Sequence, residues 1–151
     1  MKAHEIMKKQ VITVNESVTV RSVVEKFIKH QISGLPVTND HNEIVAYISD
    51  GDIMRYRGKH KDIVVDTIAY INVVKGDDVN FEQRVKNILD VNVLKVAKKK
   101  IAKVSWDDDM EDIAAILGRR RIKKLPVERD GKLVGIISRG DVIRHAFNKM
   151  L

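Results

Sequence analysis

An internal repeat of about 50 residues constrains this chain more than any other feature of its sequence. The chain has two prolines, and both lie in the same context, Pro36 in LPVTNDHNEIVAYISDGDIMR and Pro126 in LPVERDGKLVGIISRGDVIR. The similarity extends upstream without a gap, so that residues 4–40 align with residues 94–130. A repeat of this size indicates one supersecondary unit built twice, whose copies bury their apolar surfaces against each other.

Length and composition limit the class of protein. With 151 residues, 44% hydrophobic and 32% charged, the chain is predicted to fold as one compact domain or as two small halves that share a core. The absence of cysteine excludes a disulfide framework and thiolate chemistry. The first residues lack the apolar centre of a signal peptide, and no apolar run has membrane-spanning length. We therefore expect a cytoplasmic protein without a membrane segment.

Each copy shows the same order of predicted elements. In the first copy, residues 11–14 are typical of a strand, and Val20, Val23, Val24, Phe27 and Ile28 form the apolar stripe of a helix. Strands at 35–37 and 44–48 and a helix from Ser49 follow. The second copy repeats this order with strands at 101–104, 125–127 and 133–137 and helices around 110–117 and from 138. The predicted fold class is α/β, with two pseudo-symmetric strand–helix–strand–strand–helix units packed through their sheets.

An insert separates the two copies. We predict a first motif at 1–56, an insert at 57–93 and a second motif at 94–151. The insert is predicted to be helical, because Phe81, Val85, Ile88 and Leu89 have helical spacing. It carries more apolar residues than a linker requires, so it could pack on a flank or form a dimer seam.

A Ser-x-x-Asp motif recurs where the last strand of each copy meets its final helix. The two copies are Ser49–Asp52 and Ser138–Asp141. Taken alone, such a motif is typical of a capping box, in which the serine and the acid satisfy the first backbone groups of a helix. Two copies at equivalent places, each following Leu-Pro-Val at a near-constant distance, favour an additional role in binding.

Both copies resemble cystathionine-beta-synthase (CBS) motifs, and the chain resembles a tandem CBS pair, also called a Bateman module, over most of its length. The resemblance rests on a strand, an amphipathic helix, LPV and IS-x-GD-[IV]-[MI]-R, in this order and twice. In this family, paired sheets form clefts that bind adenosine-containing ligands. The resemblance implies that Asp52 and Asp141 accept hydrogen bonds from ribose hydroxyls, and that Ser49 and Ser138, with nearby backbone N–H groups, contact phosphate. It further implies an adenine slot lined by the main chain around Thr13, Gly34, Leu35 and Pro36 in one copy and Lys103, Lys124, Leu125 and Pro126 in the other.

The two implied sites differ in charge. Arg119–Arg121 and Lys123–Lys124 precede Leu125, whereas Ser33 and Gly34 precede Leu35. We therefore predict that the site containing Asp141 binds the more anionic ligand, or binds its ligand more tightly.

The leading hypothesis is a stand-alone regulatory module that binds AMP, ADP, ATP or an S-adenosylmethionine-like compound and controls an unidentified protein partner. No residue set combines a nucleophile, a base and oxyanion donors, so we expect no enzymatic activity and no required cofactor. The histidines show no metal-ligand spacing. A homodimer is expected from the resemblance. Two alternatives stay open: a nucleic-acid-binding protein, which the net charge of +7 admits, and a structural dimer with empty clefts.

Overall fold

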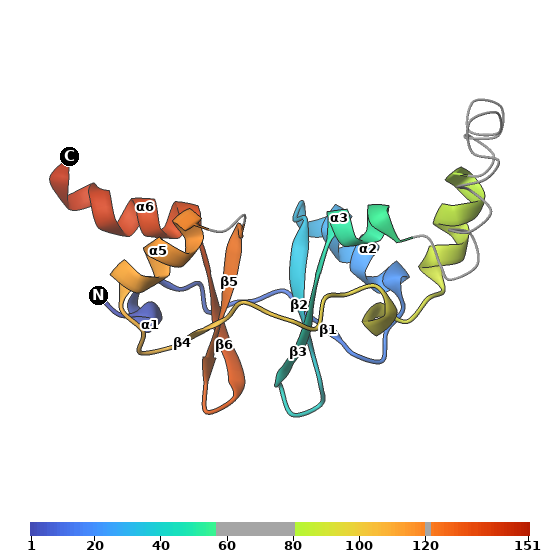
Figure 1. Cartoon of the computed structure of the whole chain (residues 1–151), viewed down its shortest axis with the longest axis horizontal. Helices are drawn as coiled ribbons and strands as arrows, with labels where there is room; N and C mark the ends of the chain where they lie inside the picture. Colours follow the sequence, from blue (N-terminus) through green and yellow to red (C-terminus); the bar gives the residue numbers. More distant parts are fainter. Residues whose placement is uncertain (57–80, 120–121) are drawn as a thin grey trace.

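The computed structural model describes residues 1–56, 81–119 and 122–151, and the first part of the predicted insert, residues 57–80, lies outside them. Two three-stranded sheets stand beside each other at the centre of the molecule, with helices on their outer sides (Figure 1). One sheet comes from each copy of the repeat. The sheets therefore meet on the faces that the helices leave uncovered.

Both sheets have the same topology. In the first half, β1 (Val14–Asn15) runs parallel to β2 (Gly34–Thr38), which pairs antiparallel with β3 (Ile44–Ser49). In the second half, β4 (Val104–Ser105), β5 (Lys124–Arg129) and β6 (Lys132–Ser138) repeat this arrangement. The helices are α2 (Val20–His30) and α3 (Asp50–Arg55), then α5 (Met110–Arg119) and α6 (Arg139–Phe147). The predicted α/β fold with two pseudo-symmetric units is confirmed.

The first strand of each unit is shorter than its sequence indicates. Residues 11–13 and 101–103 were expected to be strand, but ladder pairing begins only at Val14 and Val104. Both segments arrive from the opposite half of the molecule and do not join a sheet. Their residues are half-buried, except Lys103, which is exposed. Their β-branched residues suit an extended connection as well as they suit a strand.

Each half has its own apolar core between sheet and helices. In the first half, Val23 of α2 packs with Leu35, Val37 and Ile48 of the sheet. In the second half, Ile113 and Leu117 of α5 pack with Leu125, Val127 and Ile137. Each such side chain contributes about 1.5–3 kcal/mol when buried completely. Helix α2 ends at Gln31, whose φ of 53° is left-handed and closes the last turn.

The two halves exchange the segments that precede their first strands. Helix α1 (Ala3–Ile6) packs in the second-half core, and the Ala3 N–H donates to the Asp108 carbonyl at 2.8 Å. The short 3₁₀ helix η1 (Val93–Lys95) packs in the first-half core, where the Val93 N–H donates to the Val18 carbonyl at 3.0 Å. A spatial half is therefore not one continuous stretch of sequence.

Two connecting segments cross between the halves as a result, and both are visible in Figure 1. Lys8 pairs with Ile136 of β6, and Lys98 pairs with Tyr47 of β3, each as an antiparallel bridge. The sheet turns also meet, because the Asn42 side chain donates to the Leu133 carbonyl at 2.9 Å. The halves are thus joined by backbone hydrogen bonds at several places.

The described end of the insert lies against the first half. Residues 81–89 form a helix at the outer edge of the molecule, beyond α2 (Figure 1). Ile88 is buried, and after this helix the Val91 carbonyl accepts a hydrogen bond from the Val20 N–H at 2.9 Å. Phe81 and Val85 are exposed. Within the described ranges, the helices are too short or too polar to cross a membrane.

Candidate functional site: two capped aspartates and a pocket

Both Ser-x-x-Asp motifs form complete capping boxes. Ser49 precedes α3, and Asp52 Oδ2 accepts hydrogen bonds from the Ser49 N–H and hydroxyl, each at 3.0 Å. Ser138 precedes α6, and Asp141 Oδ2 accepts the equivalent pair at 2.9 Å each. The serine oxygens accept from the N–H groups of the aspartates in return. One oxygen of each carboxylate is therefore committed to helix capping.

The second carboxylate oxygen faces an arginine from the same helix. Arg55 donates to Asp52 Oδ1 at 3.2 Å, and Arg144 donates to Asp141 Oδ1 at 2.8 Å. Glycine leaves room for this arginine, because a Cβ at Gly51 would lie 2.9 Å from a guanidinium nitrogen of Arg55, which would then have to shift. At Gly140 the corresponding distance to Arg144 is 3.0 Å. This geometry explains why Ser-x-Gly-Asp-x-x-Arg recurs as one unit.

A lysine from a crossing segment also approaches each aspartate. The Lys98 Nζ lies 3.7 Å from Asp52 Oδ1, and the Lys8 Nζ lies 3.9 Å from Asp141 Oδ1. The aspartates are 8% and 4% exposed, whereas the cations around them are largely exposed. Burial disfavours the charge of Asp141, but the hydrogen bonds from Ser138 and Arg144 and the Lys8 charge outweigh it and lower its pKa. Each site is thus a buried anion beneath exposed cations.

A pocket of about 380 Å³ opens in the second half beside the start of β4. Two predicted site residues, Lys103 and Leu125, line it together with Ile101, Ala102, Ile116 and Arg119. Ile101, Ala102, Ile116 and Leu125 contribute apolar side chains, Arg119 adds a cation, and about half of the exposed lining is polar. The Lys103 ammonium points elsewhere, to Glu128 Oε1 at 3.0 Å. Apolar side chains beside a cation and polar backbone suit a flat, uncharged ring that carries an anionic group.

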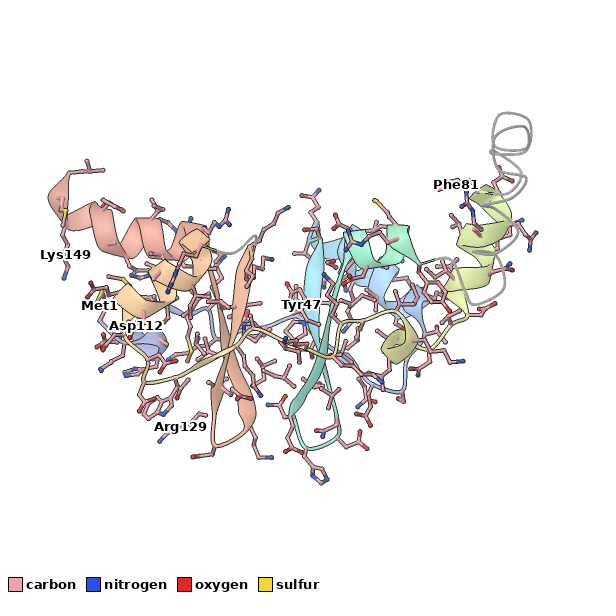
Figure 2. All side chains as sticks on the ribbon, in the orientation of Figure 1. Met1, Tyr47, Phe81, Asp112, Arg129 and Lys149 are labelled. Carbon is pink, nitrogen blue, oxygen red and sulfur yellow. The ribbon has the colours of Figure 1, made fainter. Side chains whose placement is uncertain are left out.

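The equivalent region of the first half is built differently. The carbonyl of Thr13, which aligns with Lys103, accepts a hydrogen bond from the Lys26 ammonium at 2.7 Å. Tyr47 covers Gly34, since a Cβ at Gly34 would lie 2.6 Å from the tyrosine hydroxyl. Figure 2 shows Tyr47 between the two sheets. Burial and the nearby Asp52 charge raise the Tyr47 pKa to about 12, so the phenol is neutral at pH 7.

The remaining predicted residues lie at the start of the central strands β2 and β5. Leu35 and Leu125 are completely buried, and their side chains belong to the two cores. Pro36 and Pro126 are buried as well, and Lys124 is half-buried at the start of β5. For the two leucines, only the main chain is therefore available to line a slot.

Sequence reasoning missed several residues around these sites. Arg55 and Arg144 end the recurring motif, and their recurrence three residues after the aspartate was the available signal of a shared role. Lys8 and Lys98 align in the repeat, and this alignment was their available signal. Lys26 and Tyr47 differ from their counterparts Ile116 and Ile136, and no pattern within the sequence singled them out. Among the residues described, no group of His, Cys, Asp or Glu side chains is arranged to hold a metal ion.

Comparison with known proteins identifies the family. The sequence model of the CBS domain matches residues 3–59 and 93–148. The uncharacterized protein MJ1426 of Methanocaldococcus jannaschii is 31% identical over 147 residues, which cover 92% of this chain and 87% of that protein. Other curated relatives are longer, and the chain spans 45% and 57% of the length of two of them.

Solved structures agree on the fold. The crystal structure of the CBS-pair protein CBSX2 from Arabidopsis thaliana has a TM-score of 0.76 at 22% identity, covering 99% of this chain and 96% of that one. A structure of CBSX2 in complex with AMP has a TM-score of 0.72 at 23% identity, with 99% and 98% covered. With two matched copies and this shared architecture, the chain belongs to the CBS domain family and is a tandem CBS pair.

Proposed function

We propose that this protein is a regulatory module that binds an adenosine-containing ligand, with AMP as the first candidate, and changes the state of a protein partner. The observation that carries the proposal is the pocket of the second half, where apolar side chains lie beside Arg119. Its lining includes Leu125 of β5, the strand that pairs with β6, and β6 leads to Asp141. The AMP complex of the CBS-pair protein CBSX2 supports this ligand class. Membership of the CBS family supports the regulatory role.

The residues of the second half would divide the work by their chemistry. The pocket side chains Ile101, Ala102 and Ile116 would contact the flat adenine ring. The Asp141 carboxylate would accept hydrogen bonds from ribose hydroxyls, in place of the Arg144 contact on Oδ1. The released Arg144 guanidinium, Lys124 and the Ser138 end of α6 would face the phosphate. A buried carboxylate that already accepts several hydrogen bonds is preorganised for this exchange.

The same contacts offer a route from ligand to partner. Lys8 approaches Asp141 from a crossing segment that continues from α1, and Lys98 approaches Asp52 from the other. A ligand that replaces these cations would change the contacts of both crossing segments. It would shift the balance between arrangements only by its differential affinity for them. We propose no catalytic step, so the output is a change in binding to a partner.

We also propose that the module pairs with a second copy. Met54 of α3 and Ile143 of α6 occupy equivalent places and are 80% and 55% exposed. Phe147 and Met150 extend this apolar surface along the end of the chain. Helices α3 and α6 lie on the same side of the molecule in Figure 1. Apolar side chains repeated on one side indicate an interaction surface, and a second copy offers the same chemistry.

Thermal unfolding against AMP, ADP, ATP and S-adenosylmethionine, with GTP as the control nucleotide, tests the ligand class. A ligand present at about 100 times its dissociation constant stabilises the folded state by about 2.7 kcal/mol, which shifts the melting temperature by several degrees. We expect at least one adenosine compound, and not GTP, to give this shift. A melting temperature that no adenosine compound changes would contradict the proposal and direct attention to nucleic acid, whose binding would weaken steeply with salt.

A further inference from the structure

The repeat makes the two candidate sites comparable residue by residue. Residues 4–40 align with 94–130, so Thr13 corresponds to Lys103, Lys26 to Ile116 and Gly34 to Lys124. The register of the sheets adds that Tyr47 and Ile136 are equivalent, because they pair with Pro36 and Pro126. Any difference at these positions is therefore a difference between the sites and not between the folds.

The first difference concerns the wall of the slot. Ile116 lines the second-half pocket and offers no hydrogen-bonding group. Its counterpart Lys26 is half-buried, and its ammonium donates a hydrogen bond to the Thr13 carbonyl. A ligand donor could use that carbonyl only by displacing a charge-assisted hydrogen bond. The displaced Lys26 ammonium would then lie beside the ligand ring without its hydrogen bond to the Thr13 carbonyl.

The second difference concerns the start of the central strand, at Gly34 and Lys124. In the first half, the Tyr47 ring rests on Gly34, with its hydroxyl, Cε1 and Cζ all within 3.1 Å of where a Cβ would stand. In the second half, the corresponding positions carry Ile136 and Lys124, both half-buried. The phenol thus fills space over the start of β2, where Gly34 pairs with Ser49, whereas the second half carries the flexible cation Lys124 at the position of Gly34.

We infer that the pocket of the second half is the ligand site of this chain, and that Lys26 and Tyr47 close the equivalent site of the first half. The inference rests on the proposed function and makes it specific: one adenosine ligand per chain, held beside Ile116. Lys26 and Tyr47 determine which half binds. The repeat provides matched substitutions, since each position can be given the residue of its counterpart.

Isothermal titration with AMP, on wild type and two exchanged variants, tests this assignment. We expect wild type to bind one AMP per chain, and Ile116→Lys to bind at least about tenfold more weakly, because it places the first-half cation in the pocket. The double variant Lys26→Ile, Tyr47→Ile is expected to gain a second equivalent. Ile116→Met keeps an apolar wall and serves as the matched control, with affinity within about threefold of wild type.

A second measurement keeps the test independent of folding in the variants. In wild-type protein with labelled isoleucine methyl groups, AMP is expected to shift the Ile116 resonance and to leave Ile12, at the first-half slot, unchanged. Two equal AMP sites in wild type, a shift at Ile12 alone, or unaltered binding by a folded Ile116→Lys variant would each overturn the inference while leaving the proposed function intact. Failure of wild type to bind AMP or any other adenosine compound of the thermal panel would overturn both.

Discussion

The two halves of this molecule have the same arrangement of strands and helices, but they differ in the side chains around their candidate sites. Both present a capped aspartate with an arginine three residues later and a lysine from a crossing segment. The slot beside that aspartate differs, with Lys26 and Tyr47 in one half and Ile116 and Ile136 at the equivalent positions of the other. The fold of the unit therefore determines the charged centre, whereas access to it depends on a few side chains.

The exchange of preceding segments explains why the halves can differ in this way without separating. The second-half core contains Ala3 and Ile6, and the first-half core contains Val93. Each half therefore depends on a segment that enters from the other. These connections are the contacts through which we propose that a change in one slot affects the opposite half.

The largest expected effect comes from breaking the exchange at α1. Ile6→Ala removes a buried side chain and is expected to lower the free energy of unfolding by about 2–5 kcal/mol, measured by urea denaturation. Hydrogen exchange should then speed up in β4–β6, although residue 6 precedes the first repeat strand. Ile28→Ala, at a side chain that is 74% exposed, is the control, with a change within about 0.5 kcal/mol. Faster hydrogen exchange confined to the first half would contradict the packing of α1 in the second-half core.

Gly34 offers a sharper test of the difference between the slots. Gly34→Ala places a methyl group against the Tyr47 ring and is expected to cost about 1–3 kcal/mol of stability. The cost should largely vanish in a Tyr47→Ala background, which a double-mutant cycle measures. Gly118→Ala, where a Cβ meets no atom within 4 Å, is the matched control and should not destabilise. An equal cost of Gly34→Ala in both backgrounds would place Tyr47 away from Gly34.

The two capping boxes should contribute equally to stability, although the slots beside them differ. Ser49→Ala and Ser138→Ala each remove a side-chain cap and are expected to cost about 1 kcal/mol. Chemical denaturation should give similar losses of unfolding free energy for the two variants, because the two capping boxes have the same hydrogen bonds. A cost at only one serine would show that one motif is built for a task other than capping.

A smaller effect follows from the lowered pKa of Asp141. Since folding favours its ionised form, this carboxylate stabilises the protein above the pKa of the unfolded chain, and the contribution is lost as pH falls through the lower folded value. The stability difference between wild type and Asp141→Asn should therefore be constant near neutral pH and shrink below about pH 4. Urea unfolding at pH 7 and at pH 3 measures it. A difference that grows in acid would contradict the assigned contacts.

How far the sequence predicted this molecule depends on the kind of feature. The repeat predicted two like units and the Ser-x-x-Asp spacing predicted caps, because both follow from local geometry. The exchange of α1 and η1 was not predicted, since the short stretches around Ala3 and Val93 carry no pattern that tells which core receives them. The covering of Gly34 by Tyr47 also escaped, because a contact between residues on neighbouring strands depends on register, which a single sequence leaves open.

The most direct test of the account is the affinity for AMP of three proteins: wild type, Asp141→Asn and Asp52→Asn. Asparagine keeps the shape of each side chain and removes its charge, and circular dichroism checks that the fold is kept. A hydrogen bond to a charged group contributes about 1.5–3 kcal/mol, so Asp141→Asn is expected to weaken binding by about tenfold or more, and Asp52→Asn to leave it unchanged. Loss of binding with Asp52→Asn alone, or with neither variant, would contradict the account.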